Sequence, residues 1–384
     1  MSDLPAFIRD EAHRLGFQAV GFTSAERFTA TEDVLLQRID AGLMAGLPWF
    51  TAERARLSCR PDDLLAGARS IVALAASYRT AAPPAPVDSV TRGRVARYAW
   101  GQDYHTVLKG RARELAATIS ERLGRPAAAR VFVDTSPLPE RAVAQRAGLG
   151  WVGKNTNLMV KGLGSWVFLA AIALDVDLPE GEPLATHCGS CDLCIRACPT
   201  GAIIDNYTLD NSRCISYLTI EHRGSIPAAM RPLMDDWVFG CDICQDVCPV
   251  NCKAAVVGDP AFTAPDACRV TPPLTDLLAM DVETYQTRFR GTAVKRAKRS
   301  GLRRNAAIAL GNAGDPAAVA SLAEALADPD PLVRSHAAWA LGRIGGGEAR
   351  CSLEMAATME GDLGVAEEIA QALAALADHT ASDA

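Results

Sequence analysis

Eight cysteines lie in one central stretch of the chain, and their spacing constrains the fold more than any other feature. They form two runs that each end in Cys-Pro, with one cysteine between the runs: Cys188-x2-Cys191-x2-Cys194-x3-Cys198, then Cys214, then Cys241-x2-Cys244-x3-Cys248. This spacing is typical of bacterial two-cluster ferredoxins, in which three close thiolates bind one 4Fe–4S cluster and the fourth cysteine of the run binds the other cluster.

The same spacing predicts how the eight thiolates divide between two clusters. Position 238, three residues before Cys241, is a valine, so we expect Cys214 to complete the second set. The predicted ligands are Cys188, Cys191, Cys194 and Cys248 for one cluster, and Cys198, Cys214, Cys241 and Cys244 for its neighbour.

Zinc and disulfides are the alternative uses of these cysteines. Zinc sites pair two CxxC units across a spacer, without a third close cysteine or a Cys-Pro ending. Disulfides need an oxidising compartment, and residues 1–9 lack the basic and apolar segments of an export signal. We therefore expect a cytoplasmic protein. The other cysteines are interpreted as buried thiols, with Cys252 nearest to a cluster run: Cys59, Cys252, Cys268 and Cys351.

Length and composition indicate an ordinary globular protein. The 384 residues are enough for two or three domains, and 49% of them are hydrophobic. The longest apolar stretch, Trp166–Leu174, is too short to cross a bilayer, so we expect no membrane contact. The net charge of −6 does not by itself indicate nucleic-acid binding.

Three regions with different sequence patterns follow one another along the chain. We predict an α/β domain at 1–178, a ferredoxin-like domain with two 4Fe–4S clusters at 179–265, and α-helical HEAT-like repeats at 270–384. In the first region the patterns predict helices at 4–15 and 107–123, the latter stopped by Gly124, and strands at 19–23, 70–75, 130–134 and 165–174.

The third region contains an internal repeat. Residues 302–311 align with residues 333–342, and a degenerate third copy begins at Val365. Each copy is interpreted as part of a helix pair, with Asp-Pro turns at 315–316 and 328–331 between helices. Such units bury their apolar faces only against one another, which predicts a short α-solenoid of HEAT type. An Ala-rich helix bundle is the alternative.

Two further motifs lie between the third and fourth predicted strands, at 133–141 (VDTSPLPER) and 147–155 (AGLGWVGKN). The glycines of the second motif precede no predicted helix, so we expect a close-packed loop and no nicotinamide or flavin site. With WGQDYH at 100–105, RCISYLT at 213–219, the cysteine runs and the repeats, these motifs resemble the epoxyqueuosine reductase family over essentially the whole chain.

That resemblance implies an activity. Members of the family bind cobalamin in an N-terminal domain related to reductive dehalogenases, without a histidine beneath the cobalt. They reduce epoxyqueuosine to queuosine in the anticodon loop of tRNA, the last step of queuosine biosynthesis. The clusters supply single electrons from an external donor. The resulting cob(I)alamin attacks the epoxide, and an aspartate, here Asp134, donates the proton.

The roles of single residues are expectations from the same resemblance. Partial burial would keep Asp134 protonated for its role; the alternative is a turn cap shared with Thr135 and Ser136. His105 is interpreted as structural. Serine replaces an expected arginine at position 58, where Arg56 or Arg60 could substitute. The predicted cobalamin contacts are Ser58, Ala96, Asp134, Lys154, Asn155, Leu158, Leu169, Glu221 and Asn251.

A basic run in the third region is where we expect tRNA to bind. Closely spaced Lys and Arg residues bind phosphates by releasing counterions, whatever the base sequence. The run has no acidic residue; the alternative is one solvated helix face. Its members are Arg288, Arg290, Lys295, Arg296, Lys298, Arg299, Arg303 and Arg304.

Two other functions are compatible with these patterns. A related cobalamin reductase acting on a small molecule, such as an organohalide, would not need the repeats or the basic run. An electron carrier that docks through its helical repeats would not bind a corrin. The sequence requires no assembly beyond a monomer.

Overall fold

The computed structural model describes residues 3–382, and the chain divides into two compact units. The first unit comprises Met1–Ala81, Gly101–Ser212 and Asp242–Thr263, and the second comprises Ala82–Trp100, Arg213–Cys241 and Ala264–Ala384. The units do not follow the predicted domain boundaries, because the cysteine-rich region contributes segments to both of them. The division at 178 and 270 therefore stays a prediction.

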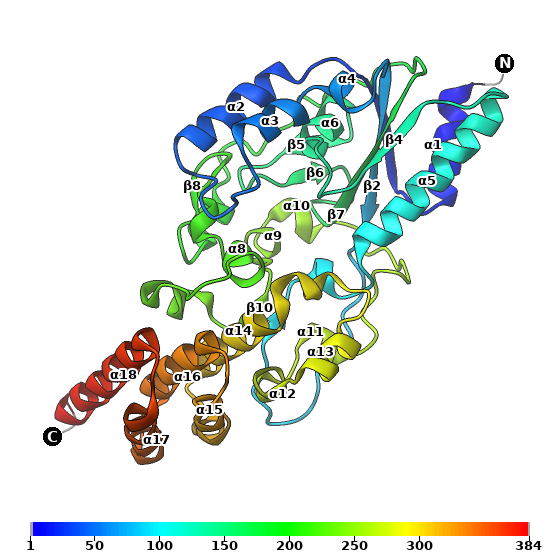
Figure 1. Cartoon of the computed structure of the whole chain (residues 1–384). Helices are drawn as coiled ribbons and strands as arrows, with labels where there is room; N and C mark the ends of the chain where they lie inside the picture. The colour runs from blue at the N-terminus through cyan, green and yellow to red at the C-terminus, as the bar shows by residue number, and fades with distance from the viewer. Residues whose placement is uncertain (1–2, 383–384) are drawn as a thin grey trace. The chain divides into compact units, whose positions relative to one another are not determined.

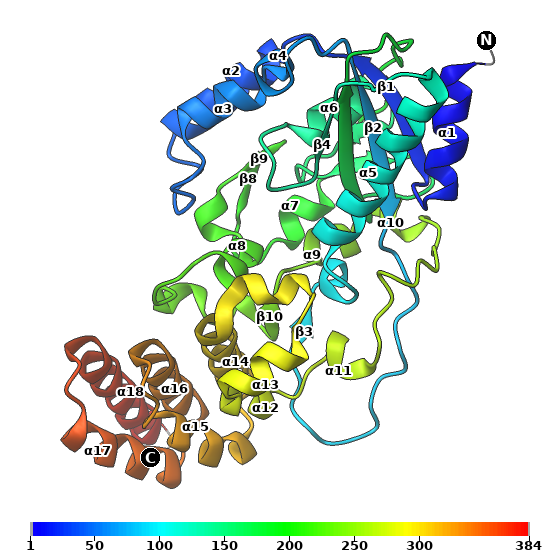
Figure 2. The ribbon, with the colours of Figure 1, turned by 45° about the vertical axis from the view of Figure 1, so that its right-hand side comes forward.

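A four-stranded antiparallel sheet forms the core of the first unit (Figures 1 and 2). Its strand order is β1 (Ala19–Ser24), β2 (Ser70–Ser77), β7 (Val167–Leu174) and β4 (Ala129–Phe132). All eight residues of β2 are buried, as expected for a central strand covered on both faces. The four predicted strands are confirmed, except that β4 ends before Asp134.

Helices and a hairpin cover the two faces of this sheet. On one face lie α1 (Leu4–Arg14) and α5 (Tyr104–Leu123), and on the other lie α6 (Glu140–Arg146) and the hairpin of β5 (Gly150–Val152) and β6 (Leu158–Val160) (Figure 2). Gly124 ends α5 with φ +66°, as predicted. The loop predicted at 148–153 is in part strand β5. A Cβ at Gly150 would lie 2.0 Å from the Met159 carbonyl oxygen, which confirms the close packing.

Apart from α2, the remaining elements of the first unit are short. The cysteine-bearing helices α7 and α9 pack against each other. These elements are α2 (Thr29–Asp40), α3 (Ala52–Ser58), α4 (Pro61–Leu64), α7 (Leu193–Ala197), β8 (Ile203–Asp205), β9 (Thr208–Leu209), α9 (Ile243–Asp246) and α10 (Pro249–Cys252).

The second unit is mainly helical. Its strands β3 (Arg94–Val95) and β10 (Trp237–Phe239) form a small parallel pair. Its α-helices are α8 (Ile215–Ile220), α11 (Ala267–Val270), α12 (Leu274–Ala279), α13 (Val282–Arg288), α14 (Lys298–Ala313), α15 (Val319–Ala325), α16 (Pro331–Ile344), α17 (Gly347–Met359) and α18 (Leu363–Ser382), and the 3₁₀ helix η5 (Ala293–Ala297) precedes α14.

The predicted repeats are confirmed as stacked helices. The three copies lie on α14, α16 and α18, which pack in series, with α15 and α17 between them in the chain (Figure 2). The predicted Asp-Pro turns cap the next helix, because the side chain of Asp330 accepts a hydrogen bond from Leu332 N at 3.0 Å. Within the described range, none of the helices is long and apolar enough to be a membrane span.

Small residues let the repeat helices approach closely. A Cβ at Gly342 of α16 would lie 2.8 Å from the Cβ of Ala372 in α18. We expect Gly342→Ala to force these helices apart and to lower the free energy of unfolding by about 1–3 kcal/mol. Urea unfolding measures the change. Gly347→Ala in α17, where a Cβ meets nothing within 4 Å, is the matched control; equal stability of both variants would contradict this packing.

Candidate functional site

Asp134 lies in a tight turn directly after β4, in the first unit. Its backbone has φ +49°, in the left-handed region that aspartate adopts more readily than most residues. Such a conformation costs about 1 kcal/mol or more and persists only where surrounding contacts hold it. The contacts of this turn are therefore informative about its role.

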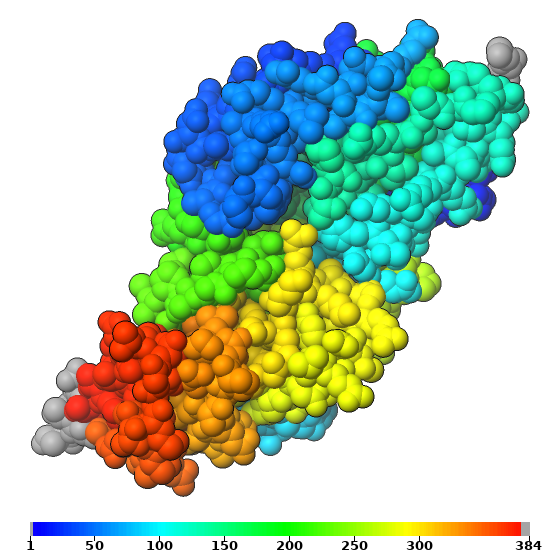
Figure 3. All heavy atoms as spheres, in the orientation of Figure 1, coloured from blue at the N-terminus to red at the C-terminus, as the bar shows by residue number. Residues whose placement is uncertain are grey.

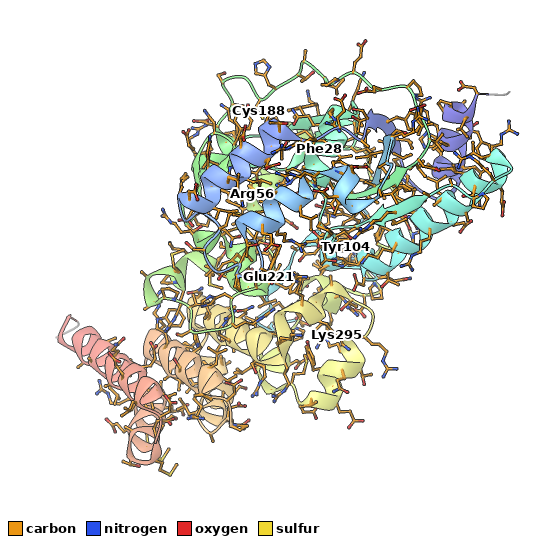
Figure 4. All side chains as sticks on the ribbon, turned by 45° about the horizontal axis from the view of Figure 1, so that its top comes forward. Phe28, Arg56, Tyr104, Cys188, Glu221 and Lys295 are labelled. Atoms are coloured by element: carbon orange, nitrogen blue, oxygen red, sulfur yellow. The ribbon has the colours of Figure 1, made fainter. Side chains whose placement is uncertain are left out.

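Two side chains from the start of α5 bind the Asp134 carboxylate. The hydroxyl of Tyr104 donates to Oδ2 at 2.7 Å, and Nε2 of His105 lies 2.8 Å from the same oxygen. Asp103 caps this helix by accepting a hydrogen bond from His105 N at 3.0 Å, and its Oδ1 lies 2.8 Å from His105 Nδ1. The imidazole thus bridges two carboxylates; Figure 4 labels Tyr104 where α5 begins.

Aromatic packing fixes Tyr104 in this position. Its ring stacks on Phe168 of β7 with centroids 4.4 Å apart and an interplanar angle of 5°, and it also stacks on His105 at 4.1 Å. Phe168 in turn contacts Phe262 edge-on at 4.8 Å. The hydroxyl is therefore held by the sheet rather than by a mobile loop.

The two carboxylates change the titration of His105. Burial alone would lower the pKa of His105, but hydrogen bonds to Asp103 and Asp134 outweigh burial and raise this pKa to about 9. The imidazole is therefore protonated at neutral pH. Asp134 itself is less buried than we expected, since 52% of its side-chain surface is exposed. Tyr104 and the protonated His105 therefore each direct a proton at the Asp134 carboxylate.

Sequence reasoning missed His105, which we interpreted as structural. Its partner Asp134 is 29 positions away, and only the packing of α5 beside β4 brings the two together. The available signal was the motif at 100–105, where an aspartate suited to a helix cap directly precedes Tyr104 and His105.

All four cysteines predicted for the first cluster lie in the first unit. Burial is the main cause that raises the pKa of Cys194 on α7, and the neighbouring thiols of Cys188 and Cys248 raise it further. These three cysteines therefore lie near one another, and the amide of Cys191 donates to the Cys188 carbonyl at 3.3 Å. Figure 4 labels Cys188.

The cysteines of the second predicted set lie at the ends of short elements. Cys198 follows α7, and its sulfur accepts a hydrogen bond from Ala202 N at 3.3 Å; Cys244 is on α9. In the second unit, Cys214 precedes α8 and Cys241 follows β10. Across residues 3–382, no three His, Cys, Asp or Glu side chains are placed to hold a single metal ion. In a cubane cluster each cysteine binds a different iron.

The prediction that the other four cysteines are buried is mostly wrong. Cys59 is buried, and burial raises the pKa of its thiol to about 11. Cys252, Cys268 and Cys351 are exposed. Each lies on a helix, where the sequence pattern alone does not show which face meets solvent.

Six of the predicted cofactor residues besides Asp134 lie in the first unit. The hydroxyl of Ser58 donates to the Arg54 carbonyl at 2.7 Å, and Asn155 is buried and donates to the Cys244 carbonyl at 3.3 Å. Asn251 accepts from Ser165 N at 2.7 Å. The other three residues are Lys154, which is buried, Leu158 on β6 and Leu169 on β7.

The two remaining predicted cofactor residues lie in the second unit. The amide of the buried Ala96 donates to the Phe239 carbonyl at 2.8 Å. Glu221, labelled in Figure 4, follows α8 and forms an ion pair with Arg296. Arg296 belongs to the basic run that was predicted to bind phosphate. The Glu221 carboxylate neutralises part of its charge.

Arg303 and Arg304 must be removed from the predicted tRNA-binding set. Arg304 is fully buried, with burial lowering its pKa to about 9, and its guanidinium donates to the carbonyls of Leu218, His222 and Gly224. Arg303 is 6% exposed and forms an ion pair with Asp328. Both guanidinium groups are therefore used inside the fold, where phosphate does not reach them.

The rest of the basic run is divided between paired and exposed side chains. Arg288 and Arg299 donate to the carbonyls of Cys268 and Met280 respectively, while retaining part of their surface. The exposed members are Arg290, Lys295 and Lys298. Figure 3 shows this segment in yellow at the surface of the second unit, and Figure 4 labels Lys295.

Comparisons with protein families agree with this organisation. Family models match residues 59–135 ("Epoxyqueuosine reductase QueG, DUF1730"), 187–251 ("4Fe-4S double cluster binding domain") and 292–374 ("HEAT repeats"). The epoxyqueuosine reductase of Xanthomonas campestris pv. campestris is 40% identical over 348 residues, which cover 90% of this chain and 97% of that protein.

Two solved structures are similar over the same length. One is epoxyqueuosine reductase with a tRNA-Tyr epoxyqueuosine-modified stem loop, with a TM-score of 0.91 and 33% identity over 97% of this chain and 98% of that chain. The other is epoxyqueuosine reductase from Bacillus subtilis with its aspartate-bearing catalytic loop swung out of the active site, with a TM-score of 0.90 and 32% identity over 97% and 99%.

The raised pKa of His105 gives a stability prediction. A histidine with a pKa raised from 6.5 to about 9 stabilises the fold fully below pH 6.5, and this contribution is lost as the pH rises through 9. We expect His105→Gln to destabilise the protein by about 2 kcal/mol at pH 6, less than the shift alone implies because Asp134 is half exposed.

Urea unfolding at pH 6 and pH 9.5 measures this difference. The exposed His187, replaced by glutamine, is the control and should change little at either pH. A His105→Gln effect of the same size at both pH values would show that the imidazole is not protonated by its two carboxylate partners.

Proposed function

We propose that this chain, which belongs to the epoxyqueuosine reductase family, reduces epoxyqueuosine to queuosine in the anticodon loop of tRNA. The observation that carries the proposal is the Asp134 carboxylate held by Tyr104 and His105, because removal of an epoxide oxygen requires proton donors at the leaving oxygen. The reaction consumes two electrons and two protons per epoxide and yields the alkene and water.

Electrons would come from an external one-electron donor through the two clusters. We propose the predicted ligands, Cys188, Cys191, Cys194 and Cys248 for one cluster and Cys198, Cys214, Cys241 and Cys244 for the other. The match of residues 187–251 to a double cluster domain and the proximity of three thiols of the first set support this division.

The residues of the first unit are compatible with a bound corrin. The indole Nε1 of Trp151 on β5 is buried and, within the described residues, has no hydrogen-bond partner, as expected for a donor that faces a ligand. Lys154, Asn155 and Leu158 continue the same hairpin. We propose that this hairpin, with Ser58, Leu169 and Asn251, helps to hold cobalamin, while Ala96 and Glu221 rest on the resemblance alone. When bound and reduced, cobalamin supplies a strong nucleophile for the epoxide carbon.

The chain's own residues would handle the proton. His105 is protonated at neutral pH, and its Nε2 lies 2.8 Å from Asp134 Oδ2. A proton can therefore pass from the imidazolium to the carboxylate, whose exposed side can present it to the substrate oxygen. Asp103 holds the imidazole at its other nitrogen and favours recharging of the ring.

We also propose the position of tRNA and the cellular setting. The exposed Arg290, Lys295 and Lys298 would contact tRNA phosphates, with Arg288, Arg296 and Arg299 contributing through their remaining exposed surface. The modified base would leave the single-stranded loop to reach Asp134, as loop bases do in RNA recognition. A monomer in the cytoplasm agrees with this role. The turn of Asp134 is our candidate for the loop that swings out in the relative from Bacillus subtilis.

Asp134→Asn tests the proton donor. The amide keeps the size of the side chain but cannot carry the proton, so we expect turnover to fall by at least about 100-fold. Cobalamin and tRNA binding should stay within a few-fold of the unsubstituted protein. Asp40→Asn, at an exposed position of α2, is the control. Normal turnover by Asp134→Asn would remove this residue from proton donation.

Glutamine substitution of Arg290, Lys295 and Lys298 tests the tRNA surface. We expect weaker binding of the epoxyqueuosine stem loop and a salt-dependence slope that is smaller by about 1 for each side chain that binds a phosphate. Binding is measured at several salt concentrations, with Arg343→Gln, an exposed arginine of α16, as control. An unchanged slope would show that these side chains form an ordinary solvated face.

A further inference from the structure

Trp49 is an exposed aromatic side chain that the proposed chemistry does not use. Of the phenylalanine, tyrosine and tryptophan residues, all of which lie in the described part of the chain, it alone is exposed, with 45% of its surface accessible to solvent. It lies in the first unit on the loop between α2 and α3, residues 41–51, which Figure 3 shows in blue at the surface. A large aromatic ring that remains in water is a candidate for contact with a ligand.

Hydrogen bonds fasten this loop to the rest of the first unit. The backbone amide of Asn211 donates to the Leu43 carbonyl at 3.1 Å, and its side-chain amide donates to the Ala45 carbonyl at 3.3 Å. At the end of the loop, the hydroxyl of Thr51 caps α3 by accepting from Arg54 N at 3.2 Å. The tryptophan ring is therefore held on an anchored backbone, as a preorganised binding surface requires.

Arg54 connects the Trp49 ring to the turn of Asp134. Its guanidinium carbon lies 5.1 Å from the centroid of the Trp49 ring, and its Nη2 donates to the Thr135 carbonyl at 2.9 Å. Phe50 contacts the same ring in an edge-on arrangement, with ring centroids 5.6 Å apart. Because Thr135 directly follows Asp134, a single side chain links the exposed ring to the backbone of the candidate site.

A tryptophan ring in contact with an arginine suits an unpaired nucleic-acid base. Proteins recognise single-stranded bases by stacking them on aromatic rings and on guanidinium planes, and every base has a face that can stack. When a modified base leaves an anticodon loop, the base next to it loses a stacking partner. A ring beside Asp134 can replace that partner, and the positive charge of Arg54 favours the polyanionic strand.

We propose that Trp49 and Arg54 form a stacking surface for the anticodon-loop base next to epoxyqueuosine. The proposal rests on the proposed function, because this substrate must reach Asp134. Stacking of the neighbouring base offsets part of the stacking that is lost when the modified base is extruded, and it fixes the strand beside the turn of Asp134. Trp49 thus contributes to the affinity for RNA without touching the reacting atoms.

Two substitutions separate stacking from simple coverage of the surface. Trp49→Leu keeps a large apolar side chain without a flat ring, and Trp49→Phe keeps a ring. We expect Trp49→Leu to weaken binding of the epoxyqueuosine-modified stem loop at least about fivefold, and Trp49→Phe to stay within about threefold of the unsubstituted protein. Val34→Ala, at an exposed apolar position of α2, is the control and should leave this affinity unchanged. Equal affinity of Trp49→Leu and the unsubstituted protein would overturn the proposal.

Stem loops that lack one base identify the stacking partner. The modified stem loop is prepared without the base on the 5′ side of epoxyqueuosine, and separately without the base on its 3′ side. We expect one of these losses to weaken binding to the unsubstituted protein at least about fivefold, but to weaken binding to Trp49→Leu by less than about twofold. If each missing base had the same effect on both proteins, no neighbouring base would stack on Trp49, and the proposal would be wrong.

Cobalamin binding and turnover are measured in parallel. An optical titration should give the same cobalamin affinity for Trp49→Leu and for the unsubstituted protein; a lower affinity of Trp49→Leu would assign the ring to the corrin and contradict the proposal. The binding measurements need no catalysis. Absence of turnover by the fully loaded unsubstituted protein would therefore contradict the proposed function, and the stem-loop affinities would still decide on Trp49.

Discussion

The contact on which the candidate site depends is the pair of hydrogen bonds from Tyr104 and His105 to a single oxygen of Asp134. It joins the first turn of α5 to the end of β4, two elements that the antiparallel sheet places side by side. Phe168 of the central strand β7 supports Tyr104 by stacking on its ring. The sheet therefore positions Tyr104 and His105 so that both contact the Asp134 carboxylate.

This arrangement separates two properties that a general acid needs. Exposure lets Asp134 meet a large substrate, but exposure also favours the ionised carboxylate. The neighbouring His105, half-buried between two carboxylates, keeps a proton within one hydrogen bond of the exposed side chain. Asp134 thus provides access to the substrate, and His105 stores the proton. A single buried aspartate could not do both.

Local patterns in the sequence were sufficient to predict much of the fold. Alternation and apolar runs located the strands of the sheet, and the repeated register located α14, α16 and α18. The cysteine spacing predicted the cluster domain because ligand geometry is encoded in short distances along the chain. Each of these features depends on neighbours within one element or one motif.

Long-range packing decided what the sequence could not show. The basic run looked uniform, yet Arg304 on α14 is buried against the carbonyls of α8 and the loop after it, whereas Lys295 on η5 is exposed to solvent. His105 looked structural until its partner 29 positions away was known. Whether a charged residue is structural or functional therefore depends on its side-chain partners across the fold and not on its residue type.

The most direct test of this account is mass spectrometry of the nucleoside product. The protein, reconstituted without oxygen with iron, sulfide and cobalamin, is reduced and mixed with a stem loop that carries epoxyqueuosine. The account requires conversion to queuosine, with the loss of one oxygen atom, only when both clusters and cobalamin are present. Unchanged epoxyqueuosine after incubation with the fully loaded, reduced protein would contradict it.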